Sequence, residues 1–293
     1  MDAIERVSER RTVSTARDEE FLVAPPRPRV EDFRPPATRL ADHWPALIVF
    51  LIVAGAWEAA VRLTHTPAYL VPAPSAIVER AAADLPYFLG EAAVTLEEAL
   101  GGLILASIGA LSAATLMAHQ RWAERAFFPL AVAIKVTPIV AVAPLLVIWL
   151  GFGPTPKIIV AALIGYFPIL SNAMTGFRTI NPRTLEFLRS LDASPREVFF
   201  ELRFPNALPY LFSAYKVATT LSVIGAVVAE WIGADRGLGH VIILANANFD
   251  MTTLAAAVLV LAAIGIGLYL VLDELERMLL FWHESTLSGT NQP

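Results

Sequence analysis

The sequence predicts an all-α, polytopic membrane protein with six transmembrane helices. Of its 293 residues, 56% are hydrophobic and 17% are charged, whereas soluble domains normally carry about 25% charged residues. The mean hydropathy of the chain is +0.58. The apolar residues gather in runs near the ~20 residues that a helix needs to cross ~30 Å of hydrocarbon. These observations favour a bundle of membrane-spanning helices over a soluble domain.

Six hydrophobic segments follow one another along the chain. We place the spans at 45–64, 92–118, 127–150, 157–176, 210–232 and 254–272. One long polar stretch, 177–209, separates the first four spans from the last two. We therefore expect residues 45–88 to hold the first transmembrane helix and an external loop, and residues 89–282 to form the main transmembrane domain.

The two ends of the chain differ from this pattern. Residues 1–44 contain eight arginines, nine acidic residues and five prolines. Such a segment buries too little apolar surface to offset its ordering entropy, so we expect a disordered tail, with a second short tail at 283–293. The chain has no cysteine, which excludes disulfides and thiolate metal sites. Its net charge is −5 and no basic stretch is broad, which argues against a nucleic-acid partner.

Basic residues predict the orientation, because they are enriched in cytoplasmic loops. Leaving the tail aside, the segments on one side of the membrane carry eight arginines. The opposite side would carry only Arg80, Lys157 and Arg236. The bias predicts that both termini and the stretch 177–209 are cytoplasmic.

The stretch 177–209 carries its own helix signals. Asn181-Pro182 is an N-cap followed by proline at the first helical position. Ser194 and Glu197 have the spacing of a capping box. These signals predict two short helices joined at Asp192-Ala193-Ser194, with Pro205 and Pro209 ending the second. Loops this long are more often functional than not, which favours a docking surface, although a loop packed on its own bundle remains the alternative.

The residues of this stretch resemble a known loop. Glu186-Phe-Leu-Arg-Ser-Leu-Asp192-Ala-Ser, followed by Leu202-Arg-Phe-Pro205, is similar to the "EAA" loop of binding-protein-dependent ABC importer permeases. The resemblance implies a type I ABC importer permease bundle whose loop seats a cytoplasmic ATPase subunit. The implied coupling residues are Glu186, Phe187, Leu188, Asp192, Ala193, Ser194 and Glu197. Asp192 stands where the family usually has glycine in a tight turn, and Asp tolerates a left-handed backbone better than most residues.

Further matches extend the resemblance over most of the chain. They are Trp57-Glu58 with Val71 to Ser75, Thr137 to Gly153, Phe167 to Asn172, and Ala229 to Gly239. They resemble the nitrate, sulfonate and taurine branch of the family. The stretch from Leu208 to Trp231 is most similar to permeases for riboflavin or a thiamine pyrimidine precursor, and a sulfonate, taurine or nitrate permease is the alternative. The resemblance implies a bacterial inner-membrane location in contact with lipid, two ATPase subunits, an external solute-binding protein and a second permease copy.

Three polar residues inside the spans are candidates for the translocation path: Lys135, Asn172 and Glu230. Ionisable groups at membrane depth face protein or water rather than lipid. Each candidate has an ordinary alternative. The Lys135 side chain can reach the headgroups, Asn172 can hydrogen-bond a neighbouring helix, and Glu230 can anchor the outer interface with a partly hydrated carboxylate.

The sequence lacks the signature motifs of several other function classes. The sequence has no G-x-x-x-x-G-K-[ST] loop, so ATP hydrolysis is assigned to a separate partner. We find no catalytic residue, metal site or cofactor motif, which argues against a membrane-bound enzyme. An ion-coupled secondary transporter predicts similar halves and acidic residues at mid-membrane. The two halves differ, and we expect no such acid.

Overall fold

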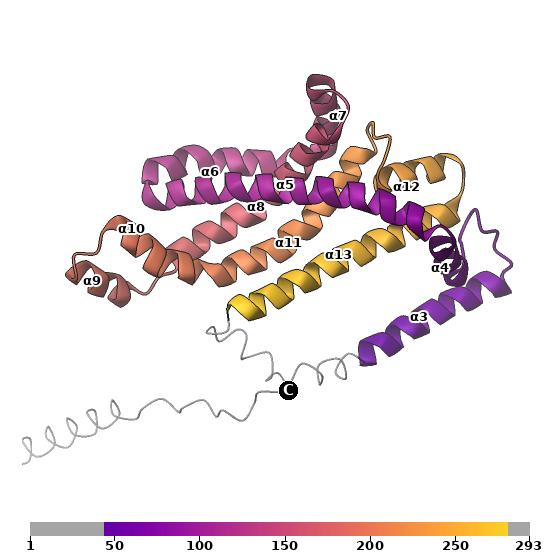
Figure 1. The fold of residues 1–293 in the computed structure, drawn as a ribbon, viewed down its shortest axis with the longest axis horizontal. Helices are drawn as coiled ribbons and strands as arrows, with labels where there is room; N and C mark the ends of the chain where they lie inside the picture. Colours follow the sequence, from indigo (N-terminus) through magenta and orange to yellow (C-terminus); the bar gives the residue numbers. More distant parts are fainter. Residues whose placement is uncertain (1–43, 281–293) are drawn as a thin grey trace, which may run out of the picture. The chain divides into compact units, whose positions relative to one another are not determined.

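The computed structural model describes residues 44–280, and these residues form helices and connecting turns without a β-strand. The predicted tails lie outside the described residues, except for Trp44. The elements are α3 (Trp44–Leu63), α4 (Pro74–Ala83), α5 (Leu85–His119), α6 (Arg121–Val136), α7 (Ile139–Leu150), α8 (Pro154–Arg178), α9 (Pro182–Ser190), α10 (Pro195–Glu197), the π-helical segment η2 (Val198–Arg203), α11 (Phe204–Glu230), α12 (Leu238–Ala247) and α13 (Met251–Leu279) (Figure 1). The chain divides into two units after Gly55, within α3, and the packing described below is that of the second unit.

Five of the six predicted spans are single helices. The helices α3, α5, α8, α11 and α13 are long and apolar enough to cross a membrane. The all-α, polytopic prediction is therefore confirmed. Most boundaries agree within a few residues, but α5 already begins at Leu85 and α13 continues to Leu279. These extra turns carry charged residues, which the hydropathy pattern excluded from the spans.

The third predicted span, 127–150, is wrong as a single helix. It is made of α6 and α7, which meet at an angle of 98°. Thr137 lies between them with an extended backbone (φ −68°, ψ 128°). A residue that precedes proline is disfavoured in the α region, and Pro138 has no N–H to continue the α6 ladder. Helix α7 starts again directly after Pro138 in a new direction.

Helices α5, α8 and α11 form the centre of the bundle. Small residues let their backbones approach closely, as is typical where membrane helices pack. A Cβ added to Gly102 of α5 would lie 2.4 Å from the Cβ of Ala161 in α8. A Cβ added to Gly225 of α11 would lie 2.7 Å from Cα of the same alanine. Ala161 is therefore enclosed by three helices, and larger side chains at these positions would separate them.

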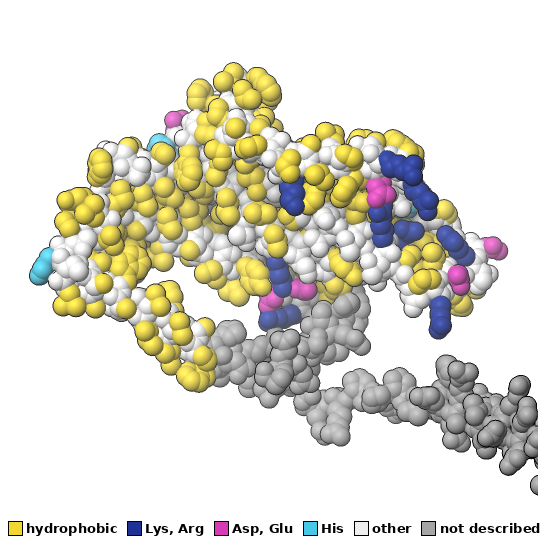
Figure 2. Space-filling model, turned by 180° about the vertical axis from the view of Figure 1, so that it is seen from behind, with side chains coloured by type: hydrophobic (Ala, Val, Ile, Leu, Met, Phe, Trp, Pro, Cys, Tyr) yellow, Lys and Arg dark blue, Asp and Glu magenta, His cyan; other side chains and the backbone are white. Residues whose placement is uncertain are grey.

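The two ends of the bundle carry different elements. Figure 1 shows α9 and α10 beyond one end of the long helices and α12 at the other. We call these the α9 end and the α12 end. Two short helices were not predicted: α4, within the presumed external loop, and α12, after the fifth span. Figure 2 shows apolar side chains over most of one face, with charged side chains in a few groups, as expected for a surface in contact with lipid.

Candidate functional site

The two short helices in the stretch 177–209 begin at the N-cap residues that the sequence predicted, Asn181 and Ser194. At the start of α9, the Asn181 side chain accepts a hydrogen bond from the N–H of Arg183 (3.0 Å). At the start of α10, Ser194 Oγ accepts from the N–H of Glu197 (3.3 Å). The Glu197 carboxylate in turn accepts from the N–H of Ser194 (2.7 Å). Both caps are confirmed, and the capping box is complete.

Asp192 ends α9 with a left-handed backbone, as expected for the position of the family's glycine. Its φ is +56°. The N–H of Asp192 donates to the carbonyl of Arg189 (3.1 Å), and the N–H of Ala193 donates to that of Leu188 (3.1 Å). This pair of bonds is a Schellman motif with Asp192 at the C′ position. The turn therefore depends on a conformation that is unfavourable for most residues other than glycine.

Polar contacts attach the loop to the bundle. Arg203 donates from Nη1 to the carbonyl of Phe177 (3.1 Å) at the end of α8. The amide of Asn206 donates to the carbonyls of Gly176 (3.0 Å) and Thr179 (2.5 Å). These bonds satisfy carbonyls that the end of α8 leaves free. They hold the start of α11 against the end of α8.

An aromatic cluster reinforces this attachment. The Phe199 ring lies at the centre, 5.3 Å from Phe177, 5.5 Å from His119 and 5.2 Å from Phe200, between ring centroids. Pairs of phenylalanine rings at such distances contribute about 0.5–1.5 kcal/mol each beyond their buried area. Phe199 therefore links the π-helical segment η2 to the ends of α5 and α8.

The expectation that Pro205 and Pro209 end the second helix was wrong. Helix α11 begins at Phe204 and contains Pro209 in its interior. Just before Pro205, the N–H of Phe204 reaches back five residues to the carbonyl of Phe199, as is typical of a π-helix. The wider turn lies directly before Pro205, which has no N–H to donate to the backbone ladder. The backbone bonds therefore change from the π-helical to the α-helical spacing at the start of α11.

The loop exposes three large apolar side chains to solvent. Phe187, Leu191 and Phe200 are 62%, 63% and 63% exposed. Glu186 is also exposed, whereas Leu188 and Ala193 are partly buried. The predicted coupling residues thus fall into a solvent-facing group and an inward-facing group. The solvent-facing group is mixed, with the apolar Phe187 beside the acidic Glu186, Asp192 and Glu197.

Lys135 lies beside the break between α6 and α7, and Asn172 lies in α8. Lys135 is exposed, one residue before the end of α6. Its Nζ lies 4.2 Å from the ring centroid of Phe167 in α8, a cation–π contact. Asn172, partly buried, donates to the carbonyl of Pro168 in its own helix (2.9 Å). The expected bond to a neighbouring helix is therefore not the one that Asn172 makes.

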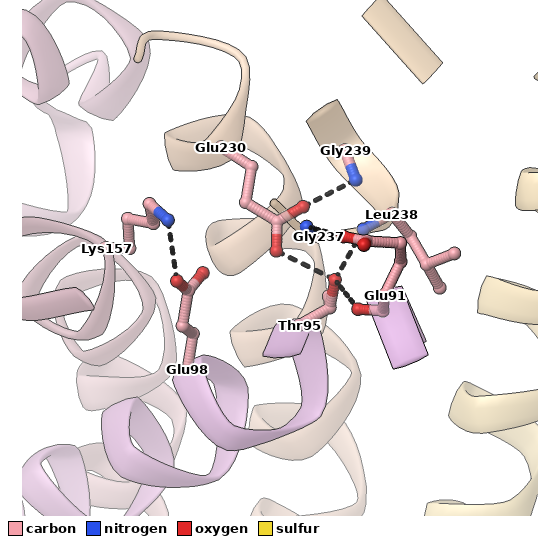
Figure 3. Close-up of polar contacts among 8 residues, drawn as sticks. All are labelled: Glu91, Thr95, Glu98, Lys157, Glu230, Gly237, Leu238 and Gly239. Carbon is pink, nitrogen blue, oxygen red and sulfur yellow. Dashed lines mark hydrogen bonds and ion pairs between the residues drawn. The ribbon is translucent and has the colours of Figure 1, made fainter. Parts of the chain in front are cut away.

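Glu230 is buried, so the alternative of a partly hydrated carboxylate at the outer interface was wrong. Its side chain is 1% exposed. Thr95 of α5 donates to its Oε1 (2.7 Å), and the N–H of Gly239 donates to its Oε2 (2.5 Å) (Figure 3). Helix α12 folds back after Gly233 and Gly237, which have positive φ angles, and so covers the carboxylate.

Three successive N–H groups at the start of α12 are bound by side chains. Figure 3 shows Gly237, Leu238 and Gly239 turned toward α5 and α11. Gly237 N–H donates to Glu91 (2.5 Å) and Leu238 N–H to Thr95 Oγ1 (2.8 Å), beside the Gly239 bond. A helix N-terminus leaves such donors unsatisfied and favours nearby carboxylates. These bonds fix the start of α12 to the bundle.

Glu98 and Lys157 form a buried ion pair that sequence reasoning missed. Lys157, which we placed in an outer loop, is 7% exposed, and its Nζ lies 2.7 Å from Oε1 of Glu98. Glu98 is 2% exposed and lies inside α5, within the predicted span 92–118, where the sequence analysis had not singled it out. A glutamate within the predicted span 92–118 was the available signal, since intramembrane acids need a partner.

Comparisons with known proteins agree with this architecture. Residues 102–280 match the family model described as "binding-protein-dependent transport system inner membrane component". The chain is 36% identical to the riboflavin transport system permease protein RibX of Chloroflexus aurantiacus, over 83% of this chain and 92% of that protein. It is 33% identical to the formylaminopyrimidine transport permease protein ThiX of Halalkalibacterium halodurans, over 81% and 95%. A solved structure of the methionine ABC transporter MetNI, 16% identical, superposes with a TM-score of 0.59 over 66% of this chain and 96% of that one.

Proposed function

This chain belongs to the family of binding-protein-dependent transport system inner membrane components, and we propose that it forms the translocation path for a small heterocyclic vitamin or vitamin precursor. The chain is a permease subunit of an ABC importer and not an enzyme. Its family implies an ATPase partner and a solute-binding partner. The location is the inner membrane.

The coupling role is assigned to the loop from α9 to η2. Its apolar side chains Phe187, Leu191 and Phe200 are exposed, while Phe199 and Arg203 attach the loop to the bundle. Because these contacts fix the loop to the ends of α8 and α11, a displacement of the loop would also move those helix ends. Two ATPase subunits would each receive one loop, with Glu186 and the Asp192 turn at the contact.

The α9 end is proposed to face the cytoplasm, with both termini on that side. Arginines gather there, at 121, 125, 178, 183, 189, 196, 203 and 277. The α12 end has fewer free basic groups than we first counted, because Lys157 is buried against Glu98. This strengthens the inference from positive charge. The solute-binding protein would then dock at the α12 end.

A second permease copy is needed to complete the path, because six spans do not easily enclose one. The break between α6 and α7 places Lys135 at an exposed position beside Phe167 of α8. Asn172 follows in the same helix. We assign Lys135 and Asn172 to the wall of the path, with the second copy opposite. Glu230 no longer belongs to this set, because it is buried by α12.

The substrate class rests on a single observation. Two relatives named for riboflavin and formylaminopyrimidine transport each match more than four-fifths of this chain. Uptake of labelled riboflavin, a formylaminopyrimidine and taurine by cells expressing the whole transporter tests the proposal. We expect uptake of one of the two heterocycles. Uptake of taurine alone would contradict the substrate class and leave the permease role standing.

A further inference from the structure

Glu98 and Glu230 bring more negative charge into the interior than their surroundings balance. The two residues are 2% and 1% exposed. Among the described residues, Lys157 is the only buried cation, and it binds one oxygen of Glu98. Arg236 lies 3.6 Å from Glu91, so its charge is matched by a third carboxylate. Two ionised carboxylates beside one ammonium group would leave an uncompensated charge in an apolar interior, which is strongly unfavourable.

The hydrogen bonds around the pair show which donor is missing. Both oxygens of Glu230 already accept a bond, from Thr95 and Gly239. Oε1 of Glu98 accepts from Lys157, but its Oε2 is buried and receives no donor from the described part of the chain. The group within hydrogen-bonding reach is the Glu230 carboxyl, toward which Glu98 is turned in Figure 3. An ionised carboxylate has no hydrogen to donate.

We propose that Glu98 and Glu230 form a binding site for one proton, carried by Glu230 and donated to Oε2 of Glu98. The proton is taken from water by the Glu230 carboxylate, so no other reactant is required. The occupied site contains one carboxylate, one carboxylic acid and one ammonium group, and its net charge is zero. Paired carboxyl groups that cannot both ionise share a proton in this way.

The surroundings fit a proton better than a metal cation. A Cβ added to Gly237 would lie 2.3 Å from Glu230 Oε1, and one added to Gly239 would lie 2.6 Å from Oε2. The chain therefore closes tightly around the carboxyl group. Hard cations require about six oxygen ligands, and within residues 44–280 no group of three His, Cys, Asp or Glu is placed to hold a metal.

The proton site is linked to the position of α12. Glu230 binds the N–H of Gly239 with the same carboxyl group that carries the proton. If α12 leaves the bundle, water reaches the pair and both carboxyl groups can ionise. The other charged groups nearby are Lys157, Glu91 with Arg236, and the exposed Glu97, and none of them fills the gap at Glu98 Oε2. Proton occupancy should therefore follow α12 docking.

Infrared spectroscopy of the purified full-length permease tests the proposal, because a carboxylic acid and a carboxylate absorb at different frequencies. At neutral pH we expect the carbonyl band of a protonated carboxyl group shielded from water. The substitution Glu230→Gln should abolish this band. Glu98→Gln should also abolish it, because an ionised Glu230 is then the one buried carboxylate that balances the ammonium charge of Lys157. Glu97→Gln, the same change on the exposed face of α5, should leave the band in place.

The infrared spectra distinguish a proton at this site from a water molecule or a metal cation. If Glu98 Oε2 binds a water molecule or a cation instead, both carboxyl groups are ionised and wild-type protein shows no such band, which overturns the proposal. A band that survives in both Glu98→Gln and Glu230→Gln overturns it as well. If Glu230→Gln does not fold, the wild-type spectrum and the Glu98→Gln spectrum still decide.

Discussion

The turn at Asp192 allows a quantitative test of how the coupling loop is built. Its φ of +56° and its two Schellman bonds show a backbone that glycine adopts without strain. A non-glycine residue loses roughly 1–2 kcal/mol there, while glycine loses roughly 0.5–1 kcal/mol more entropy on folding. Asp192→Gly should therefore change the stability of the α9 end by between about 0 and 1.5 kcal/mol in the favourable direction. Asp192→Val adds β-branched crowding and should be the most damaging of the set.

Transport and substrate-stimulated ATP hydrolysis by the assembled transporter provide the assay. The backbone account predicts that Asp192→Gly is close to wild type, Asp192→Asn is close behind, and Asp192→Val uncouples ATP hydrolysis from transport without preventing membrane insertion. The rival account is that the Asp192 charge pairs with an arginine of the ATPase. In that case Gly and Val would be equally harmful. An inactive glycine variant beside an active valine variant would refute the backbone account.

Three further predictions address other parts of the molecule. Glu186→Ala and Ser194→Ala should weaken ATPase coupling more than folding, because loss of the Ser194 cap costs only about 1 kcal/mol of local stability; normal substrate-stimulated hydrolysis in both would remove the loop from the coupling role. A cysteine at Ser190 should react with an impermeant reagent only after the cytoplasmic face is opened, and one at Asn246 should react from outside; the reverse pattern would overturn the proposed orientation. Gly237→Ala combines a positive φ with a Cβ 2.3 Å from Glu230, so it should lower the melting temperature and expose α12 to proteolysis, whereas Gly265→Ala, with no atom within 4 Å, should do neither.

Local signals explain what the sequence predicted well. The caps at Asn181 and Ser194 and the turn at Asp192 depend on residues within five positions of each other. Their physical causes are therefore visible in the sequence. The spans were also predictable, because burial in lipid requires a run of apolar residues that composition alone reveals.

The wrong predictions had two causes. Some depended on contacts between residues far apart in the sequence, and one arose because hydropathy is averaged over a window of residues. Lys157 looked like a loop residue because its partner, Glu98, is 59 positions away. Glu230 looked hydrated because the fold-back of α12 depends on its own docking to α5 and α11. The 98° bend at Thr137-Pro138 was hidden because hydropathy averages over it. Proline alone did not reveal it either, since Pro129 and Pro144 lie inside α6 and α7.

Co-purification of the ATPase with the full-length permease tests the central claim most directly. The claim is that the loop from α9 to η2 binds the ATPase through its exposed apolar side chains, of which Phe187 is 62% and Leu191 63% exposed. The double substitution Phe187→Ser with Leu191→Ser should abolish co-purification while the permease remains folded in the membrane. Phe249→Ser, at a residue 71% exposed at the α12 end, is the matched control and should retain the ATPase. Full retention of the ATPase by the loop variant, or its loss from the control alone, would contradict the account.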